Sequence, residues 1–448
     1  MEINYVYEAS STVEDIVNRV QQNAVDSPDI ERLKDGEVGW GQYLDPNSSQ
    51  DHVGTYGTTT GFRLLNLRNN NSRGQCGELK IKSLNWLNRQ WSDSESITNR
   101  RKDRANTYRV AFFARMLSTY NGSDVEFPID EFSTDICRRL WDMRIDEGWP
   151  QYNYLDGSGR HDEPDLLATA FAIYCLSECE EYHSNIEYLE RLIQLSDDVI
   201  NSRNSVGDKL FLLTASFSVL SLCSVHNEGE YKIEDGGLDN DLIKDIMNSD
   251  RSLSDLIKQR TLKLVKYIRS KLRDNMNSNY YRDEFYVRLY STPEPEIKYT
   301  YLPFLIGPIV MMALVSTKNI GGKILNENIS IIETMVQYYT TRTGDAGRYV
   351  SDIRGPASIG DHLWIAEFLN EYSKLESDNL SSIRQRWGNI KYWMKPNYAM
   401  LTTVLIAVIA LTTLAMLYPN QVQFSTTLIG AIIGAVLTEV ATALSAAN

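Results

Sequence analysis

The stretch GWGQYLDPNSSQDHVGTYGTTTGF, residues 39–62, returns in outline as GWPQYNYLDGSGRHDEPDLLATAF at residues 148–171. Aligned without a gap at an offset of 109, residues 39–67 and 148–176 share nine identical residues out of 29. In both copies a polar, glycine-rich loop runs into a segment with helical character. Self-similarity of this kind is typical of repeat architectures, so the chain is predicted to be built from similar units. The identical pairs are Gly39/Gly148, Trp40/Trp149, Gln42/Gln151, Tyr43/Tyr152, Ser49/Ser158, His52/His161, Thr60/Thr169, Phe62/Phe171 and Leu67/Leu176.

Between residues 10 and 376 two kinds of helix-forming segment alternate, and strand signals are weak. The first kind is amphipathic, which predicts helices with one face in water. The second kind is less charged, and several examples open with a threonine followed by small residues, which predicts helices packed at a crowded centre. The amphipathic segments are 11–24, 78–91, 131–144, 185–201, 240–273 and 328–341. The less charged segments are 58–68, 106–118, 165–178, 209–223, 300–316 and 358–376.

Six such pairs, taken in order, predict an all-α fold, an α/α toroid with six inner helices ringed by six outer ones. The segment DEGWPQYNYLDGSGRHDEPDLLATAFAIYCL, residues 146–176, resembles the repeat unit of terpenoid cyclases and of the protein prenyltransferase β-subunit. The resemblance covers residues 36–67 and 146–176 and implies a central cavity with the glycine-tryptophan corners at one end. Residues 343–360 are interpreted as the sixth corner.

The catalytic signatures of these families are not matched. Class II cyclases need an Asp-x-Asp-Asp cluster, but LDNDL at 238–242 has no third consecutive Asp. Class I cyclases need a DDxxD helix for magnesium, and Asp197 and Asp198 lack the later partner. Both pairs are interpreted as solvated polar residues.

Prenyltransferases hold zinc with Asp, Cys and His ligands. Asp135 and Cys137 imitate such a pair, with His362 or His161 as a third ligand. They belong to a predicted outer helix that faces away from the cavity, so no metal and no cofactor are predicted.

A group of acidic and histidine side chains marks the loops that enter inner helices. Two interpretations remain open: a ligand-binding or acid-base site at one mouth of the cavity, or helix N-caps, for which Asp165, Asp208 and Asp361 are suited. The candidate ligand-binding residues are His52, His161, Asp162, Glu163, Asp165, Asp361 and His362.

The C-terminus has a different character, since residues 396–438 contain no Lys, Arg, Asp or Glu. Residues 398–418 as a helix would span about 32 Å, which matches a hydrocarbon core of roughly 30 Å. Residues 424–444 predict a second membrane helix. We therefore expect domains at 1–378 (toroid), 379–397 (basic juxtamembrane linker helix) and 398–448 (transmembrane helical hairpin).

The second predicted membrane helix carries small residues that favour association. Gly430 and Gly434 have the GxxxG spacing that lets membrane helices approach closely, so a homo-oligomer of hairpins is plausible. Glu439 is either an end-of-helix residue near the headgroups or a pairing carboxylate. Basic residues precede the first membrane helix, which by the positive-inside rule places the large domain in the cytoplasm.

Net charge and cysteines narrow the function. The net charge is −14 and no basic run stands out, so direct nucleic-acid binding is not expected. The five cysteines are scattered through apolar runs, which predicts reduced core thiols.

The sequence predicts a non-enzymatic, membrane-anchored effector or receptor. Its toroid would recognise a protein or small-molecule trigger, and its hairpin would anchor in or perturb membrane lipid, a mode that microbial immune effectors would suit. The alternative is a membrane-bound terpenoid cyclase or prenyltransferase-like enzyme acting on a hydrophobic isoprenoid.

Overall fold

The computed structural model describes most of the chain up to Leu375, and its described residues are predominantly helical. They contain twelve α-helices and three pairs of short strands. The predicted all-α class is therefore confirmed. Two compact units are separated by their contacts, Met1–Ser373 and Lys374–Asn448. The described residues are 3–27, 37–41, 53–67, 75–92, 104–118, 129–145, 148–154, 163–179, 182, 185–227, 253–274, 284–290, 299–343, 350–351, 355–356 and 358–375.

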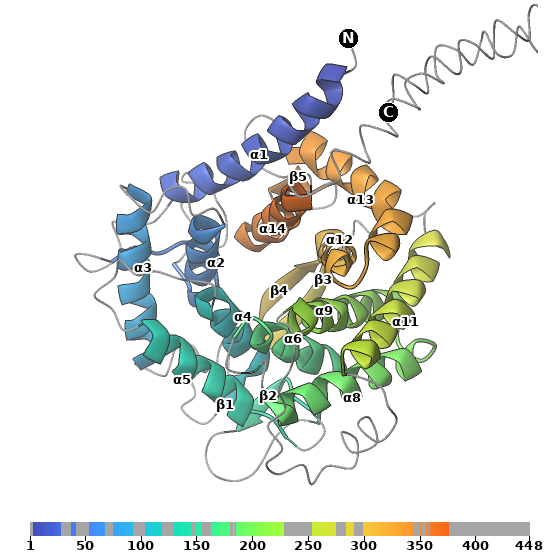
Figure 1. Cartoon of the computed structure of the whole chain (residues 1–448). Helices are drawn as coiled ribbons and strands as arrows, with labels where there is room; N and C mark the ends of the chain where they lie inside the picture. The colour runs from blue at the N-terminus through green and yellow to red at the C-terminus, as the bar shows by residue number, and fades with distance from the viewer. Residues whose placement is uncertain are drawn as a thin grey trace, which may run out of the picture. The chain divides into compact units, whose positions relative to one another are not determined.

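The helices of the first unit form an outer and an inner layer (Figure 1). The predicted helical segments all have counterparts among them. The outer helices are α1 (Ile3–Asp26), α3 (Gln75–Ser92), α5 (Ile129–Asp142), α8 (Ile186–Ser202), α11 (Leu253–Asp274) and α13 (Gly322–Thr343). The inner helices are α2 (Thr55–Asn66), α4 (Thr107–Ser118), α6 (Leu166–Leu176), α9 (Asp208–Asn227), α12 (Ile306–Ser316) and α14 (Ile359–Leu375).

Contacts between the helices follow chain order. Along the inner layer α2 contacts α4, α4 contacts α6, α6 contacts α9 and α9 contacts α12. In the outer layer α8 contacts α11, and α1 contacts both α3 and α13. The first and last outer helices therefore lie side by side, as Figure 1 also shows.

Burial separates the two layers as the composition predicted. In α6 every residue from Leu167 to Leu176 is buried, so the whole helix surface is packed against protein. In α8 the buried residues fall on one face, and Asn185 caps the helix by accepting a hydrogen bond from the Tyr188 backbone N–H at 3.1 Å. An apolar helix without a wet face is stable only in such an interior position.

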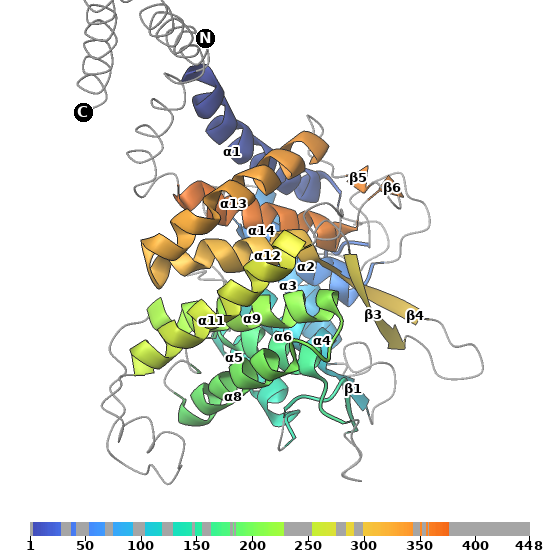
Figure 2. The ribbon, with the colours of Figure 1, turned by 90° about the vertical axis from the view of Figure 1, so that its right-hand side faces the viewer.

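Three antiparallel strand pairs interrupt the helices. Strand β1 (Arg104–Asn106) pairs with β2 (Tyr152–Tyr154), and β5 (Val350–Ser351) pairs with β6 (Gly355–Pro356). The longest pair is the hairpin of β3 (Glu284–Tyr290) and β4 (Tyr299–Leu305), which lies at one end of the helices in Figure 2.

The hairpin corrects one sequence expectation. Residues 300–305 were expected to begin an inner helix, but they form β4 and the helix starts at Ile306. Tyr299, Thr300 and Tyr301 are aromatic or β-branched residues that suit a pleated strand. The partner strand EFYVRLY is also rich in aromatic and β-branched residues, but neither strand was predicted from the sequence.

The repeated glycine-tryptophan stretch makes the same corner twice. The Trp149 backbone N–H donates to Thr169 Oγ1 at 2.9 Å, and the Trp40 N–H donates to Thr58 Oγ1 at 3.2 Å. The two residues of each bond are 20 apart in the second copy and 18 apart in the first. The loop of the second copy is thus two residues longer. The residue of the first copy that is equivalent to Thr169 is Thr58, not Thr60 as in the ungapped alignment.

Each corner tryptophan also completes the end of the preceding outer helix. The Trp40 indole N–H donates to the Ala24 carbonyl at 2.8 Å, and the Trp149 indole donates to the Leu140 carbonyl at 2.7 Å. Both carbonyls lie in the last turn of their helix, where backbone acceptors have no partner within the helix. Both indoles are fully buried. At the predicted corners, these tryptophans therefore act as C-terminal caps of the outer helices.

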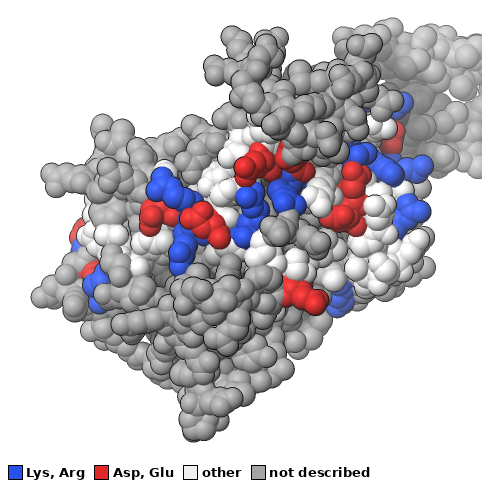
Figure 3. Space-filling view, turned by 90° about the horizontal axis from the view of Figure 1, so that it is seen from below, with Lys and Arg blue, Asp and Glu red and all other residues white. Residues whose placement is uncertain are grey.

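Ion pairs join successive outer helices on the surface. Arg144, just after α5, binds Glu187 of α8 at 3.1 Å, and Arg260 of α11 binds Asp197 of α8 at 2.7 Å. Arg269 of α11 pairs with Glu327 of α13. On the face in Figure 3, acidic and basic side chains of the described residues are intermingled, without a field of one sign.

The cysteines agree with the prediction in part. Cys76, Cys175 and Cys223 are free and buried, and burial raises the pKa of the Cys223 thiol to about 12. Cys137 of α5 and Cys179, which follows α6, form a disulfide, so the expectation that all five are reduced thiols is wrong for this pair. The fold brings together two cysteines that are 42 residues apart in sequence.

The predicted linker 379–397 and hairpin 398–448, with Gly430, Gly434 and Glu439, lie outside the described residues. Within the described part, one helix is long and apolar enough to cross a membrane, Asp208–His226 of α9. Its most apolar window is 72% buried inside the protein, so its composition is explained by its place in the core.

Candidate functional site

Asp165, one of the predicted site residues, acts as the N-cap of α6. Its Oδ1 accepts a hydrogen bond from the Ala168 backbone N–H at 2.7 Å and another from the Tyr108 hydroxyl at 2.7 Å. Burial and then the nearby Asp165 raise the pKa of Tyr108 well above its usual range, so Tyr108 stays a hydrogen-bond donor. Asp165 thus connects the starts of α4 and α6.

Asp361 and His362 perform a similar task at the start of α14. Asp361 Oδ2 accepts from the Ser358 N–H at 2.9 Å and from its hydroxyl at 2.8 Å, while the Asp361 N–H donates to Ser358 Oγ at 3.2 Å. This reciprocal pattern is a capping box. His362 Nδ1 lies 2.8 Å from the Ser358 carbonyl oxygen, and both Asp361 and His362 are buried.

The other predicted loop residues are not brought to these caps. Glu163 is exposed on the loop before α6. His52, His161 and Asp162 lie outside the described residues. Asp165 and Asp361 therefore make the hydrogen bonds expected of helix N-caps, and a shared ligand site remains a prediction.

Asp135 and Cys137, which resemble part of a zinc-binding set in the sequence, have other partners in the structure. Asp135 Oδ2 accepts a hydrogen bond from the Trp91 indole of α3 at 2.9 Å, and Cys137 is bonded to Cys179. Within the described ranges no group of three or more His, Cys, Asp or Glu side chains has a metal-binding arrangement. Asp197, of the rejected DDxxD pair, binds Arg260 on the outer surface, as its polar-face interpretation predicts.

Aromatic rings from several inner helices meet in the middle of the helical unit. Phe171 of α6 has its ring centroid 5.2 Å from that of Phe217 of α9 and 5.1 Å from that of Phe304 of β4. Trp364 of α14 lies 6.2 Å from Phe304, and Phe112 of α4 lies 6.5 Å from Phe171. All five residues are buried. These rings therefore form one buried aromatic cluster that joins α4, α6, α9, β4 and α14.

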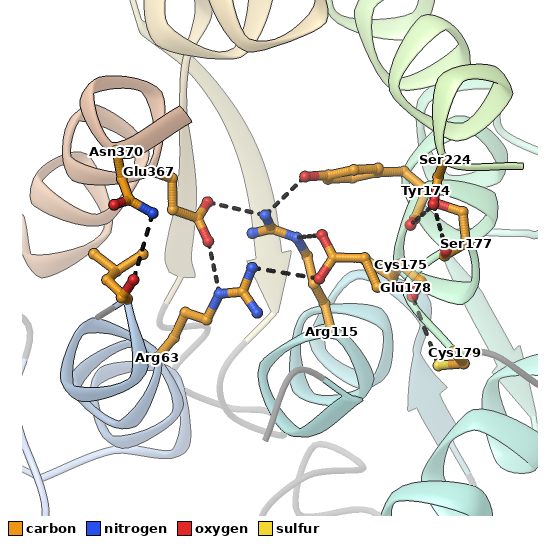
Figure 4. Close-up of polar contacts among 11 residues, drawn as sticks. Arg63, Arg115, Tyr174, Cys175, Ser177, Glu178, Cys179, Ser224, Glu367 and Asn370 are labelled. Carbon is orange, nitrogen blue, oxygen red and sulfur yellow. Dashed lines mark hydrogen bonds and ion pairs between the residues drawn. The ribbon is translucent and has the colours of Figure 1, made fainter. Parts of the chain in front are cut away.

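Next to the aromatic rings lies a buried network of two arginines and two glutamates, here called the central charge network: Arg63, Arg115, Glu178 and Glu367 (Figure 4). Arg63 lies on α2, Arg115 on α4 and Glu367 on α14, while Glu178 is in the turn after α6. The network therefore joins four inner elements.

Glu367 accepts from both arginines. Arg63 Nε donates to its Oε1 at 2.7 Å and Arg115 Nη2 donates to its Oε2 at 2.9 Å. Arg115 Nε donates to Glu178 Oε1 at 3.0 Å, and an Arg63 Nη lies 3.4 Å from Glu178 Oε2. Two positive and two negative charges balance, which is the condition for burying charged groups at tolerable cost.

Arg115 has further support. Its side chain is only 2% exposed, and its guanidinium lies 4.8 Å from the Tyr174 ring centroid and 5.0 Å from that of Trp364. Arg115 Nη2 also donates to the Tyr174 hydroxyl at 2.7 Å. These contacts surround the planar cation with aromatic faces, a favourable arrangement for a desolvated guanidinium.

The environment fixes the charge states of the network. Burial alone would raise the pKa of Glu367, but the charges of Arg115 and Arg63 and their hydrogen bonds outweigh it and lower the pKa below its usual range. Burial would lower the pKa of Arg115, yet Glu178 and Glu367 raise it well above normal. Glu367 and Arg115 are thus held ionised at neutral pH.

Helices α2 and α14 lie side by side in parallel register. Arg63 and Glu367, which form an ion pair, are 304 residues apart in sequence. Asn370 Nδ2 donates to the Leu67 carbonyl at 3.4 Å, and these two residues are 303 apart. At the other end, a Cβ atom on Gly360 would collide with the Tyr56 hydroxyl, so the missing side chain permits the close approach. The last inner helix therefore packs on the first.

The sequence prediction did not include the central charge network. Its signal was a charged residue within each apolar run: Arg63 in TTTGFRLLNL, Arg115 in AFFARML and Glu367 in LWIAEFL. A charge in a helix predicted to be buried demands an opposite charge. Which charge it meets depends on the closure of the helices, which the spacing along the chain does not reveal.

No family model, curated protein or solved structure matches this chain.

Proposed function

We propose that the protein is a non-enzymatic, membrane-attached effector or receptor. In this proposal residues 1–378 form a closed α/α toroid that recognises a protein or small-molecule trigger, and residues 398–444 form a membrane hairpin. The toroid is supported by the parallel packing of α14 on α2 and by the contact of α1 with α13.

The observation that carries the non-enzymatic part is the aromatic packing in the middle. Phe171, Phe217, Phe304 and Trp364 pack on one another between the inner helices, in the interior where a terpenoid cyclase-like enzyme would hold an isoprenoid substrate. A site for such a ligand needs a volume of roughly 300–1,000 Å³. Interlocked aromatic rings favour a rigid recognition body over a reaction chamber.

The membrane part rests on composition. Residues 396–438 lack charged side chains, and the unit boundary after Ser373 precedes them. A charge-free stretch of this length favours insertion in lipid. Gly430 and Gly434 would bring hairpins together, and their association would open a leak.

Fractionation of expressing cells tests the membrane attachment. The full chain should remain in the membrane pellet after alkaline carbonate washing, and a chain ending at Ser381 should be soluble. Protease added outside spheroplasts should leave the N-terminal unit intact, because we place it in the cytoplasm. A full chain released by carbonate would contradict the proposal.

Two further outcomes distinguish effector from enzyme. Purified full chain in liposomes should release a trapped dye when its trigger is present, and a variant with G430L and G434L should release less. If the chain ending at Ser381 instead converted a polyprenyl diphosphate, the isoprenoid enzyme would replace the effector as the function.

A further inference from the structure

Helix α14 is the last described element before the hydrophobic C-terminus. It ends at Leu375, next to the boundary between Ser373 and Lys374. Every residue from Ser358 to Asn370 is buried, so this helix is held from several sides. In sequence, α14 is followed by the basic stretch and then by the charge-free residues 396–438.

Glu367 makes two ion pairs that attach α14 to other inner helices. Its two carboxylate oxygens bind different helices, Oε1 to Arg63 of α2 and Oε2 to Arg115 of α4. The side chain of Glu367 is 5% exposed, so water does not replace these bonds. Phe368 contacts Tyr339 and Trp364 contacts Phe304 through their rings, and Trp364 also lies 5.0 Å from the Arg115 guanidinium.

The central charge network has two separable halves. Glu178 binds the same two arginines from the turn after α6, with side-chain exposure of 17%. Without Glu367, Glu178 still pairs with Arg63 and Arg115. Its carboxylate therefore continues to join α2 and α4 to the turn after α6. Helix α14 then loses the two ion pairs that Glu367 makes with Arg63 and Arg115.

We propose that Glu367 is a latch that fixes α14 to α2 and α4, and that opening of this latch is the step by which the body controls its C-terminal segment. The second half of this inference rests on the proposed membrane function. The latch itself does not, because it concerns contacts within residues 1–375.

Hydrogen exchange of the full chain tests the latch. E367Q removes the charge from α14, and E178Q removes an equal charge from the other half of the network. In E367Q the exchange of the α14 amides should accelerate at least roughly tenfold more than that of the α3, α5 and α8 amides, because α14 opens locally before the whole unit unfolds. In E178Q the α14 amides should stay within about threefold.

Three results would overturn the latch: unchanged exchange in α14 of E367Q, an equal increase in every helix, or an equal loosening of α14 by E178Q. If E367Q does not fold, E367D keeps the charge on a side chain one methylene shorter and is expected to loosen α14 in the same selective way. Selective loosening without any change in dye release from liposomes would overturn the control step and leave the fractionation result untouched.

Discussion

Single residues at the corners determine where outer helices end and inner helices begin. Trp149 binds Leu140 of the helix behind it and Thr169 of the helix ahead, and Trp40 does the same with Ala24 and Thr58. The sequence predicted that the two glycine-tryptophan stretches form corners. It did not predict the two-residue shift at the threonines, because an ungapped alignment cannot place an insertion inside a loop.

Gly148 is required by both conformation and space. Its φ is +153°, which side-chain-bearing residues rarely adopt, and a Cβ atom there would lie 2.5 Å from Thr169 Oγ1. G148A should lower the free energy of unfolding by about 1–3 kcal/mol. G207A is the matched control, since a Cβ at Gly207 meets nothing within 4 Å, and it should change stability by less than about 0.5 kcal/mol. Urea denaturation measures both, and equal effects would contradict the role of the corner.

The indole of Trp149 caps a buried carbonyl. W149F removes the shorter of two hydrogen bonds to the Leu140 oxygen, which keeps the Met143 N–H at 3.3 Å, so the free energy of unfolding should fall by about 1–3 kcal/mol from lost bonding and packing. W91F is the control, because its hydrogen bond to Asp135 lies at the surface, and it should cost about half as much or less. Urea denaturation measures both variants. A W149F variant as stable as W91F would contradict the role of Trp149 as a C-terminal cap.

At the scale of elements, the helix periodicity was sufficient to predict both layers, and the exception has a physical cause. Residues 300–305 are mostly apolar, as in an inner helix, but they pair with residues 284–289. Strand pairing is a non-local contact, so a short apolar run does not by itself distinguish a strand from a helix. The partners of Arg63 and Arg115 are non-local in the same sense.

Acid should weaken the central charge network. The folded-state pKa of Glu367 is lowered, so its contribution to stability is present above the unfolded value, about 4.3, and is lost as the pH falls through the folded value. E367Q should be about 3–5 kcal/mol less stable than wild type at pH 7, with a smaller difference at pH 3.

The control for this pH series is E187Q. Glu187 pairs with Arg144 on the surface with a side chain 66% exposed, and its substitution should cost less than about 1 kcal/mol. Denaturation at several pH values measures these differences. A gap between wild type and E367Q that does not narrow in acid would contradict the ionised Glu367.

For the whole molecule, the central claim is that the chain of helix pairs closes on itself. Composition and rhythm predicted the helices, but an open solenoid of helix pairs has the same rhythm. The proposed closure depends on α14 meeting α2, and the contact of Arg63 with Glu367 joins residues 304 apart in sequence.

A double-mutant cycle between Arg63 and Glu367 tests this closure most directly. The free energies of unfolding of wild type, R63M, E367Q and R63M/E367Q are compared at pH 7. A closed ring predicts a coupling of at least about 1.5 kcal/mol, because the two side chains share a buried ion pair. Additive effects, with a coupling below about 0.5 kcal/mol, would mean that α2 and α14 do not meet and that the ring is open.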